Sequence, residues 1–332
     1  MLRGKFCYIF AKKAFFTLMV LIGASLVIFL VIKAAPGDPV NLLIDTLHST
    51  PEEVAVLRHE LGLEGSIITQ YFRWLKRVSV LDFGNSIVIR RGMPVMSLLL
   101  PAIKQTVILT FGSLVFSFLL ASFIVYFVLS RRHSMLARLL LFLAYLVSST
   151  PIFLLAYVII YLLNSSVIRL TSAGIIARPG WFPLPHSTFG VIPFCFSVLA
   201  LSLGNGFLIE FIRYLREEFD KVLHEDYIRT AKAKGASLFK HTFRNVLIPI
   251  TTLITSKISF LLGGAVIVET VFNWPGVGRL AWDAATTQDY PIILAITLLT
   301  AIIVRLSSLI NDFVYLVNDP RAMEENYMGS EL

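Results

Sequence analysis

The sequence is poor in charged residues and in cysteine. Only 15% of its 332 residues are Asp, Glu, Lys or Arg, whereas soluble domains average about a quarter. The hydrophobic content of 56% and the mean hydropathy of +0.78 exclude a disordered chain and argue against a soluble enzyme. Cys7 and Cys195 cannot build a disulfide-rich secreted scaffold, and neither has a Cys or His at metal-ligand spacing. No metal site is therefore predicted.

Long apolar segments predict transmembrane helices, each of which needs about 20 apolar residues. Four such segments contain no Asp, Glu, Lys or Arg: 14–32, 105–130, 139–163 and 187–209. Two more carry charge: 246–268 contains Lys257, and 290–317 contains Arg305 and Asp312. We therefore predict an all-α polytopic membrane protein with six transmembrane helices, the first at 14–32 and the other five within 105–317.

The basic residues predict the orientation of these helices. Short cytoplasmic loops are enriched in Lys and Arg, and eight of these residues lie between Arg213 and Arg244. A basic N-terminal segment precedes the first span, so both termini, 1–13 and 318–332, are expected in the cytoplasm of a cell-membrane protein. A cleaved signal peptide is the alternative for 14–32, but this run exceeds the ~7–15 residues of a signal core, and Lys33 occupies the cleavage region.

Residues 33–104 form the predicted extracytoplasmic insertion. Thr50, Pro51 and Glu53 have the pattern of a helix start, and Gly62 ends this helix. A second amphipathic helix is predicted over 67–78, followed by a turn over 81–86. Two interpretations remain open: a docking platform for an external partner, or a cap that shields helix ends.

The segment 210–245 is charged, helical in pattern and longer than a simple connection. Small residues precede Gly235 and apolar residues follow it, which predicts a helix–turn–helix along the cytoplasmic surface. The alternative is a basic loop held near anionic lipid.

The same segment resembles the EAA loop of permease subunits in ABC-type importers. Thr230-Ala231-Lys232 stands in the place of Glu-Ala-Ala, followed by Gly235 and by Ile248-Pro249. More narrowly, the chain resembles the B-type subunits of dipeptide, oligopeptide and nickel permeases. Further matches occur in order at 35–39, 82–84, 100–102, 226–235, 269–279 and 289–291.

The resemblance implies a coupling helix that docks on a cytoplasmic ATPase subunit. The residues it would place in this role are Thr230, Ala231, Lys232, Lys234, Gly235, Leu238, Phe239, Arg244 and Pro249. It also implies a second homologous permease subunit, two ATPase subunits and an extracytoplasmic solute-binding protein. The chain has no phosphate-binding Gly-x4-Gly-Lys-Ser/Thr loop, so ATP is expected to be used by the partners, and no cofactor is expected on this chain.

Lys257 and Arg305 are the predicted substrate-pathway residues, because an intramembrane cation is costly unless it faces protein or water. Snorkelling, or pairing with Asp312 or a partner subunit, is the alternative. The loop 272–290 is interpreted as a short re-entrant or surface helix at the external mouth, where Trp274 and Asp283 are candidate contacts for a solute-binding protein. Aromatic residues at this depth also serve as interface anchors.

Two other function classes fit the residues poorly. An ion-coupled secondary transporter should bury carboxylates at mid-depth, and the first four apolar segments contain none. An intramembrane hydrolase needs a metal motif or an activated nucleophile; His59-Glu60 lacks the second histidine, and Ser256 and Ser259 beside Lys257 have no further support. We therefore predict no catalytic residues and a peptide importer permease, with nickel or another small solute as the alternative cargo.

Overall fold

A computed structural model describes residues 2–34, 40, 50–60, 64–131, 134–174, 191–204, 206–226, 228, 234, 250, 253–254, 257, 263 and 265–318. The chain divides into two compact units. Unit 1 comprises Met1–Gln105 and Pro275–Leu306, and unit 2 comprises Thr106–Trp274 and Ser307–Leu332.

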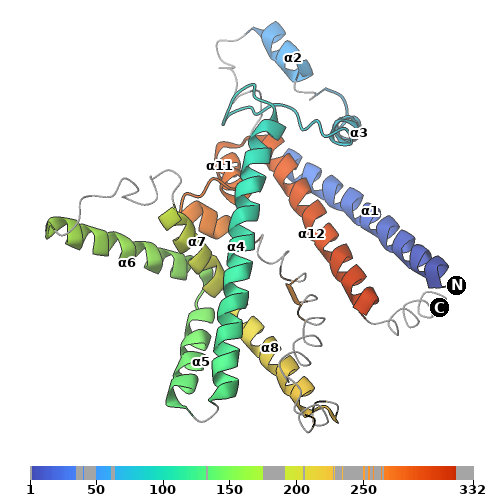
Figure 1. Ribbon diagram of the computed structural model, residues 1–332. Coiled ribbons are helices and arrows are strands. Elements are labelled where there is room, and N and C mark those ends of the chain that lie inside the picture. The colour runs from blue at the N-terminus through green and yellow to red at the C-terminus, as the bar shows by residue number, and fades with distance from the viewer. Residues whose placement is uncertain are drawn as a thin grey trace. The chain divides into compact units, whose positions relative to one another are not determined.

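All regular elements in the described residues are helices (Figure 1). They are α1 (Leu2–Ala34), α2 (Pro51–Glu60), α3 (Ile67–Val78), α4 (Val95–Ser130), α5 (Met135–Ser148), α6 (Ile152–Ser172), α7 (Val191–Leu203), α8 (Phe207–His224), α11 (Val277–Thr287) and α12 (Tyr290–Asn318). Within this described part of the chain, four stretches are long and apolar enough to cross a bilayer: Ala11–Ala34, Val95–Ser130, Ile152–Ser172 and Tyr290–Phe313. The prediction of an all-α polytopic membrane protein is confirmed.

The segment 139–163, predicted as one helix, is two helices in the structure. α5 ends at Ser148 and α6 begins at Ile152. Pro151 has no N–H to donate to the preceding turn, and its ring disfavours the helical conformation at Thr150. The prediction of one continuous helix was wrong because mean hydropathy does not register this break.

The segment 187–209 is interrupted in the same way, between α7 and α8. Gly206 adopts a φ of +79°, which is left-handed backbone that glycine tolerates without cost. Pro193–Leu203 and Phe207–Val222 are bent by 57° relative to each other, and together they form a possible fifth span. α8 also extends well into 210–245, so the first part of the predicted coupling segment is a continuous helix.

The two breaks in unit 2 contact each other. The Gly206 N–H donates to the Ser148 carbonyl at the end of α5, with an N···O distance of 2.7 Å. Gly204 lies so close to Ile152 that a Cβ added there would be 3.0 Å from Ile152 Cγ1. This contact ties the ends of α5 and α7 to the beginnings of α6 and α8.

Each unit has its own apolar core. In unit 2, one face of α8 is buried and contributes Phe207, Leu208, Phe211, Ile212 and Leu215. In unit 1, one cluster of buried apolar side chains comprises Phe83, Val95, Leu99, Ala284, Ile292, Ala295, Ile296 and Leu298. α4 and α12 each have residues in both units, so the chain passes from one unit to the other within these two helices.

The helices predicted within 33–104 are confirmed. α2 begins at Pro51, and α3 has the predicted limits of 67–78. The Thr69 N–H donates to the Ser66 hydroxyl, which therefore caps the start of α3.

The predicted turn after α3 is present. Arg77 Nε donates to Asp82 Oδ2 at 2.8 Å, and the Gly84 N–H donates to Asp82 Oδ1 at 2.9 Å. The hydrogen bonds from Arg77 and Gly84 lower the pKa of Asp82 below its ordinary value. These contacts therefore stabilise the turn at neutral pH, and the stabilisation is lost as the pH falls through the lowered pKa.

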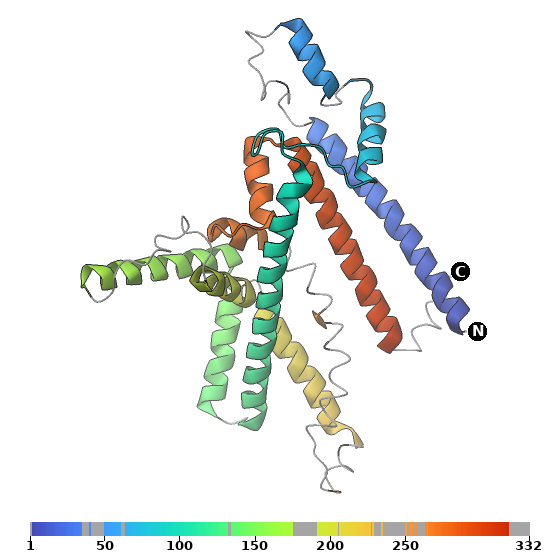
Figure 2. The same cartoon turned by 45° about the horizontal axis from the view of Figure 1, so that its top comes forward.

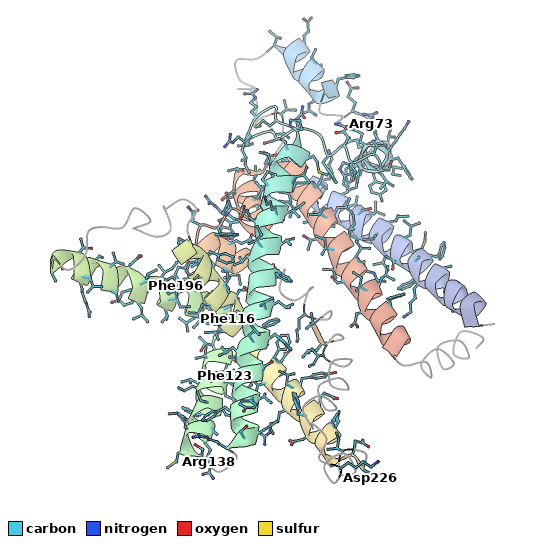
Figure 3. The ribbon with its side chains drawn as sticks, viewed as in Figure 1. Arg73, Phe116, Phe123, Arg138, Phe196 and Asp226 are labelled. Carbon is cyan, nitrogen blue, oxygen red and sulfur yellow. The ribbon has the colours of Figure 1, made fainter. Side chains whose placement is uncertain are left out.

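Polar ends of three helices gather at one end of unit 2. Figures 1 and 2 both place the connection between α4 and α5 at the same end as the C-terminus of α8. Arg138 of α5 and Asp226, just beyond α8, lie at this end (Figure 3). The connection between α4 and α5 and the C-terminus of α8 therefore share one end of this unit.

The contact between Gly204 and Ile152 gives a direct test of the broken-helix geometry. Gly204→Ala is expected to destabilise the protein by roughly 1–3 kcal/mol, the usual cost of overpacking. Gly23→Ala in α1 is the matched control, since nothing lies within 4 Å of a Cβ at that position. Thermal unfolding of the purified protein in detergent measures both variants. Equal melting temperatures for Gly204→Ala and the parent protein would contradict the close contact.

Candidate functional site

The predicted coupling segment is described in part. Lys234 is in an exposed turn. The other residues predicted for this role, Thr230, Ala231, Lys232, Gly235, Leu238, Phe239, Arg244 and Pro249, lie outside the described residues. Their coupling role stays a prediction.

The helix that leads into this segment, α8, packs against the core of unit 2. α8 buries its apolar face in unit 2, and its opposite face carries the pairs Lys221–Glu218 at 2.7 Å and Arg216–Asp220 at 3.9 Å. Such exposed pairs each contribute little to stability. Beyond α8, Ile228 is only 3% exposed. Apolar burial, rather than the surface ion pairs, therefore fixes the start of the segment.

Lys257 is paired within the chain. Its Nζ donates to Glu210 Oε2, from the first turn of α8. The two side chains are 16% and 40% exposed, respectively. Lys257 therefore has a carboxylate partner 47 residues earlier in the sequence. Sequence reasoning considered Asp312 or another subunit as the partner and missed Glu210, although Glu210 directly follows an uncharged apolar segment.

Arg305 contacts α1 in unit 1. Its Nη2 donates to Thr17 Oγ1 at 3.1 Å, and its guanidinium carbon lies 5.9 Å from the centre of the Phe16 ring. This is a hydrogen bond with a cation–π contact rather than an ion pair. The substrate-pathway role predicted for Lys257 and Arg305 remains a prediction; the described contacts show what each side chain touches.

The residues predicted for the external mouth have different environments. Trp274 is 6% exposed and packs against Phe194 of α7, with ring centres 5.5 Å apart. Asp283 lies on α11, the short helix expected within 272–290, and Asp283 Oδ2 is 3.7 Å from Arg279 Nε. Asp283 is partly exposed, whereas Trp274 belongs to the core of unit 2.

Asp289 is a fully buried carboxylate that holds the loop between α3 and α4. Asp289 Oδ2 accepts from the Ser86 hydroxyl at 2.6 Å and from the Val88 and Ile89 N–H groups at 3.0 Å each, and Oδ1 accepts from the Ile87 N–H at 3.2 Å. Charge-assisted bonds to backbone N–H groups are among the stronger hydrogen bonds in proteins. Sequence reasoning noted 289–291 as a motif but did not predict this contact, which joins residues about 200 positions apart.

Glu269 is the corresponding buried carboxylate of unit 2. Its side chain is fully buried, and Thr106 Oγ1 donates to Glu269 Oε1 at 2.6 Å. The Trp274 N–H donates to the Glu269 backbone carbonyl at 2.8 Å. Glu269 thereby connects α4 to the turn after 265–271. In both units, a motif carboxylate has a packing role.

The Lys257–Glu210 pair predicts non-additive effects of substitution. Lys257→Met or Glu210→Gln alone leaves the other charge without this partner and is expected to destabilise the protein by roughly 1–2 kcal/mol, between the values for exposed and buried pairs. The double variant is expected to lose less than the sum of the single losses. Thermal unfolding of all four proteins measures this coupling, and strictly additive losses would exclude it.

The Asp289 contacts predict a large loss of stability when this carboxylate is removed. Asp289→Ala leaves the buried N–H groups of the loop without an acceptor and should cost roughly 2–3 kcal/mol. Asp283→Ala, the same change at a partly exposed site in α11, is the control and should cost much less. Hydrogen exchange should rise at Ile87, Val88 and Ile89 only in the Asp289 variant. Unchanged protection of these amides would show that Asp289 does not hold the loop.

Comparisons with known proteins extend over nearly the whole chain. Residues 114–324 match the family model described as a binding-protein-dependent transport system inner membrane component, and residues 6–89 match its N-terminal companion. The oligopeptide transport system permease protein AppB of Bacillus subtilis is 32% identical, covering 93% of this chain and 97% of the relative.

Two other relatives have similar coverage. A putative peptide permease protein of Brucella suis is 33% identical over 91% of this chain and 94% of its own. The glutathione transport system permease protein GsiC of Salmonella paratyphi A is 33% identical over 89% of this chain and 92% of its own. Together with the long apolar helices, these matches show that the chain belongs to the family of binding-protein-dependent transport system inner membrane components.

Proposed function

We propose that this chain is a pore-forming subunit of an ATP-driven importer for peptides. The observation that carries this proposal is the similarity, over about nine-tenths of the chain, to permeases named for oligopeptide, peptide and glutathione transport. Glutathione is itself a small peptide, so the three names share one cargo chemistry. The alternative of nickel or another small solute has no comparable support.

The proposed complex contains three further kinds of protein component. The family description supports a solute-binding protein outside the membrane. A second homologous permease subunit would complete the pore, and two cytoplasmic ATPase subunits would bind and hydrolyse ATP. The sequence has no phosphate-binding loop of its own. We therefore propose that this chain carries no catalytic site and no cofactor, and that membrane lipid surrounds it.

The proposed topology has six crossings with both termini in the cytoplasm. α1, α4 and α12 supply three of the four unbroken stretches that are long enough to cross, and α6 contains the other. The third crossing runs through the α5–α6 break, the fourth through the α7–α8 break, and 246–268 would be the fifth. Arg131 and Arg138 lie at or beside the α4–α5 connection, which shares one end of unit 2 with the α8 C-terminus. This arrangement supports placing that connection and the basic segment after α8 on the same, cytoplasmic side. The insertion 33–104 then lies outside.

The proposed coupling mechanism uses the segment after α8. Gly235 and Ala231 would allow close approach to a groove of the ATPase, while Lys232, Lys234 and Arg244 would face acidic groove edges. Because α8 is packed into unit 2 by its apolar face, a displacement of the segment would be transmitted to that core. Alternating access would follow from ATP-driven closure of the ATPase pair.

The coupling proposal predicts the effect of a bulky side chain at Gly235. Gly235→Trp is expected to lower ATP-dependent peptide uptake by the reconstituted complex at least about tenfold, since a lost docking contact of 1.4 kcal/mol already changes an equilibrium tenfold. Lys221→Gln, on the exposed face of α8, is the control and should transport normally. The amount of this chain in the membrane should match the parent for both variants. Normal uptake by Gly235→Trp would refute the coupling role.

A further inference from the structure

α3 has an apolar face wider than its contact with the rest of unit 1. Tyr71 is buried, and Trp74 and Val78 are half-buried on the same side of the helix. Next to this buried stripe, Ile68 and Phe72 are 69% and 61% exposed. The turn that follows α3 adds Val80 and Leu81, which are 74% and 63% exposed. Ile68 and Phe72, which share one side of α3, are called the apolar edge below.

α3 is fixed against a defined level of α1. The Tyr71 hydroxyl is 2.9 Å from the Ser25 hydroxyl and donates to the Ile22 carbonyl at 3.3 Å. The Phe29 ring centre lies 5.5 Å from that of Tyr71 and 5.7 Å from that of Trp74. Figures 1 and 2 both draw α3 beside the C-terminal part of α1. All the α1 residues that α3 contacts here belong to the apolar stretch Ala11–Ala34.

With the proposed orientation, this level of α1 would lie in the outer part of the hydrocarbon layer. At a rise of 1.5 Å per residue, Phe29 lies about 8 Å inside the end of the apolar stretch at Ala34. Amphipathic interfacial helices bury their apolar face about 5–10 Å below the headgroup boundary. At the same level, α1 itself exposes Val27, Leu30 and Val31. The packing thus places α3 at the depth where such a helix would meet acyl chains.

The charge on α3 fits an anionic lipid surface. The helix contains Arg73, Lys76 and Arg77 and no acidic residue. Arg77 pairs with Asp82, while Arg73 and Lys76 are exposed on the side away from Tyr71. Basic residues beside an apolar face, with Tyr and Trp at the boundary, are typical of helices that lie in the membrane interface.

We propose that α3 is an interfacial membrane helix, whose apolar edge inserts among the acyl chains while Arg73 and Lys76 contact anionic phospholipid headgroups. This goes beyond the proposed transport function: it assigns a lipid-binding surface within an insertion that transport alone does not explain. With the proposed orientation, the leaflet is the extracytoplasmic one. The helix would fix the insertion at a set height above the pore.

Spin-label accessibility in the complete complex tests this proposal. Phe72→Cys and Ile68→Cys are made after replacing Cys7 and Cys195 by serine, and the complex is placed in nanodiscs of phosphatidylethanolamine and phosphatidylglycerol. Thr69→Cys, on the polar side of the same helix, is the matched control. The labels at 68 and 72 should collide more often with oxygen, which partitions into lipid, than with a water-soluble nickel chelate. The label at 69 should show the reverse.

Two results would overturn the proposal. Frequent collisions of the labels at 68 and 72 with the nickel chelate would place the apolar edge in water. Low accessibility of these labels to both reagents would mean that another protein covers the apolar edge. If the solute-binding protein must be added for this result, the apolar edge is its binding surface; otherwise, the second permease subunit covers it. The readout needs no transport, so it is independent of whether the complex imports peptides.

Discussion

Polar groups buried among apolar helices must find partners within the protein, because neither lipid nor an apolar core can hydrogen-bond to them. The structure meets this requirement through a few side chains. Asp289 accepts four hydrogen bonds from the loop between α3 and α4, and Glu269 accepts one from Thr106 of α4. Lys257 is paired with Glu210. In a transporter, such buried charged residues could indicate a substrate or ion site. In this structure, their described contacts join helices and loops to one another.

The same requirement explains why the broken helices remain ordered. A helix end leaves N–H and carbonyl groups without intrahelical partners. At the α5–α6 and α7–α8 breaks, the Gly206 N–H satisfies the Ser148 carbonyl. This backbone contact joins the two interruptions. Since α8 leads into the proposed coupling segment, the break is the structural link between the packed helices and the site where ATPase subunits would act.

Apolar runs and capping residues predicted much of the fold from the sequence. The limits of α3 agree with the prediction because Ser66 and the apolar spacing act locally. The breaks at Pro151 and Gly206 were missed, since a hydropathy average responds to composition and not to backbone conformation. The partners of Lys257 and Asp289 were missed for another reason: they lie 47 and about 200 residues away, and only tertiary packing brings them together.

The coupling segment was inferred from a family resemblance, and the family is now shown. In the proposed complex, this chain forms the pore while other subunits supply ATP hydrolysis and cargo capture. Native mass spectrometry of the complex purified from its own membranes tests this arrangement. The expected mass contains two permease subunits, two ATPase copies and a solute-binding protein that carries a peptide. Recovery of the chain alone, or only as a self-associated form, under conditions that retain bound lipid would contradict it.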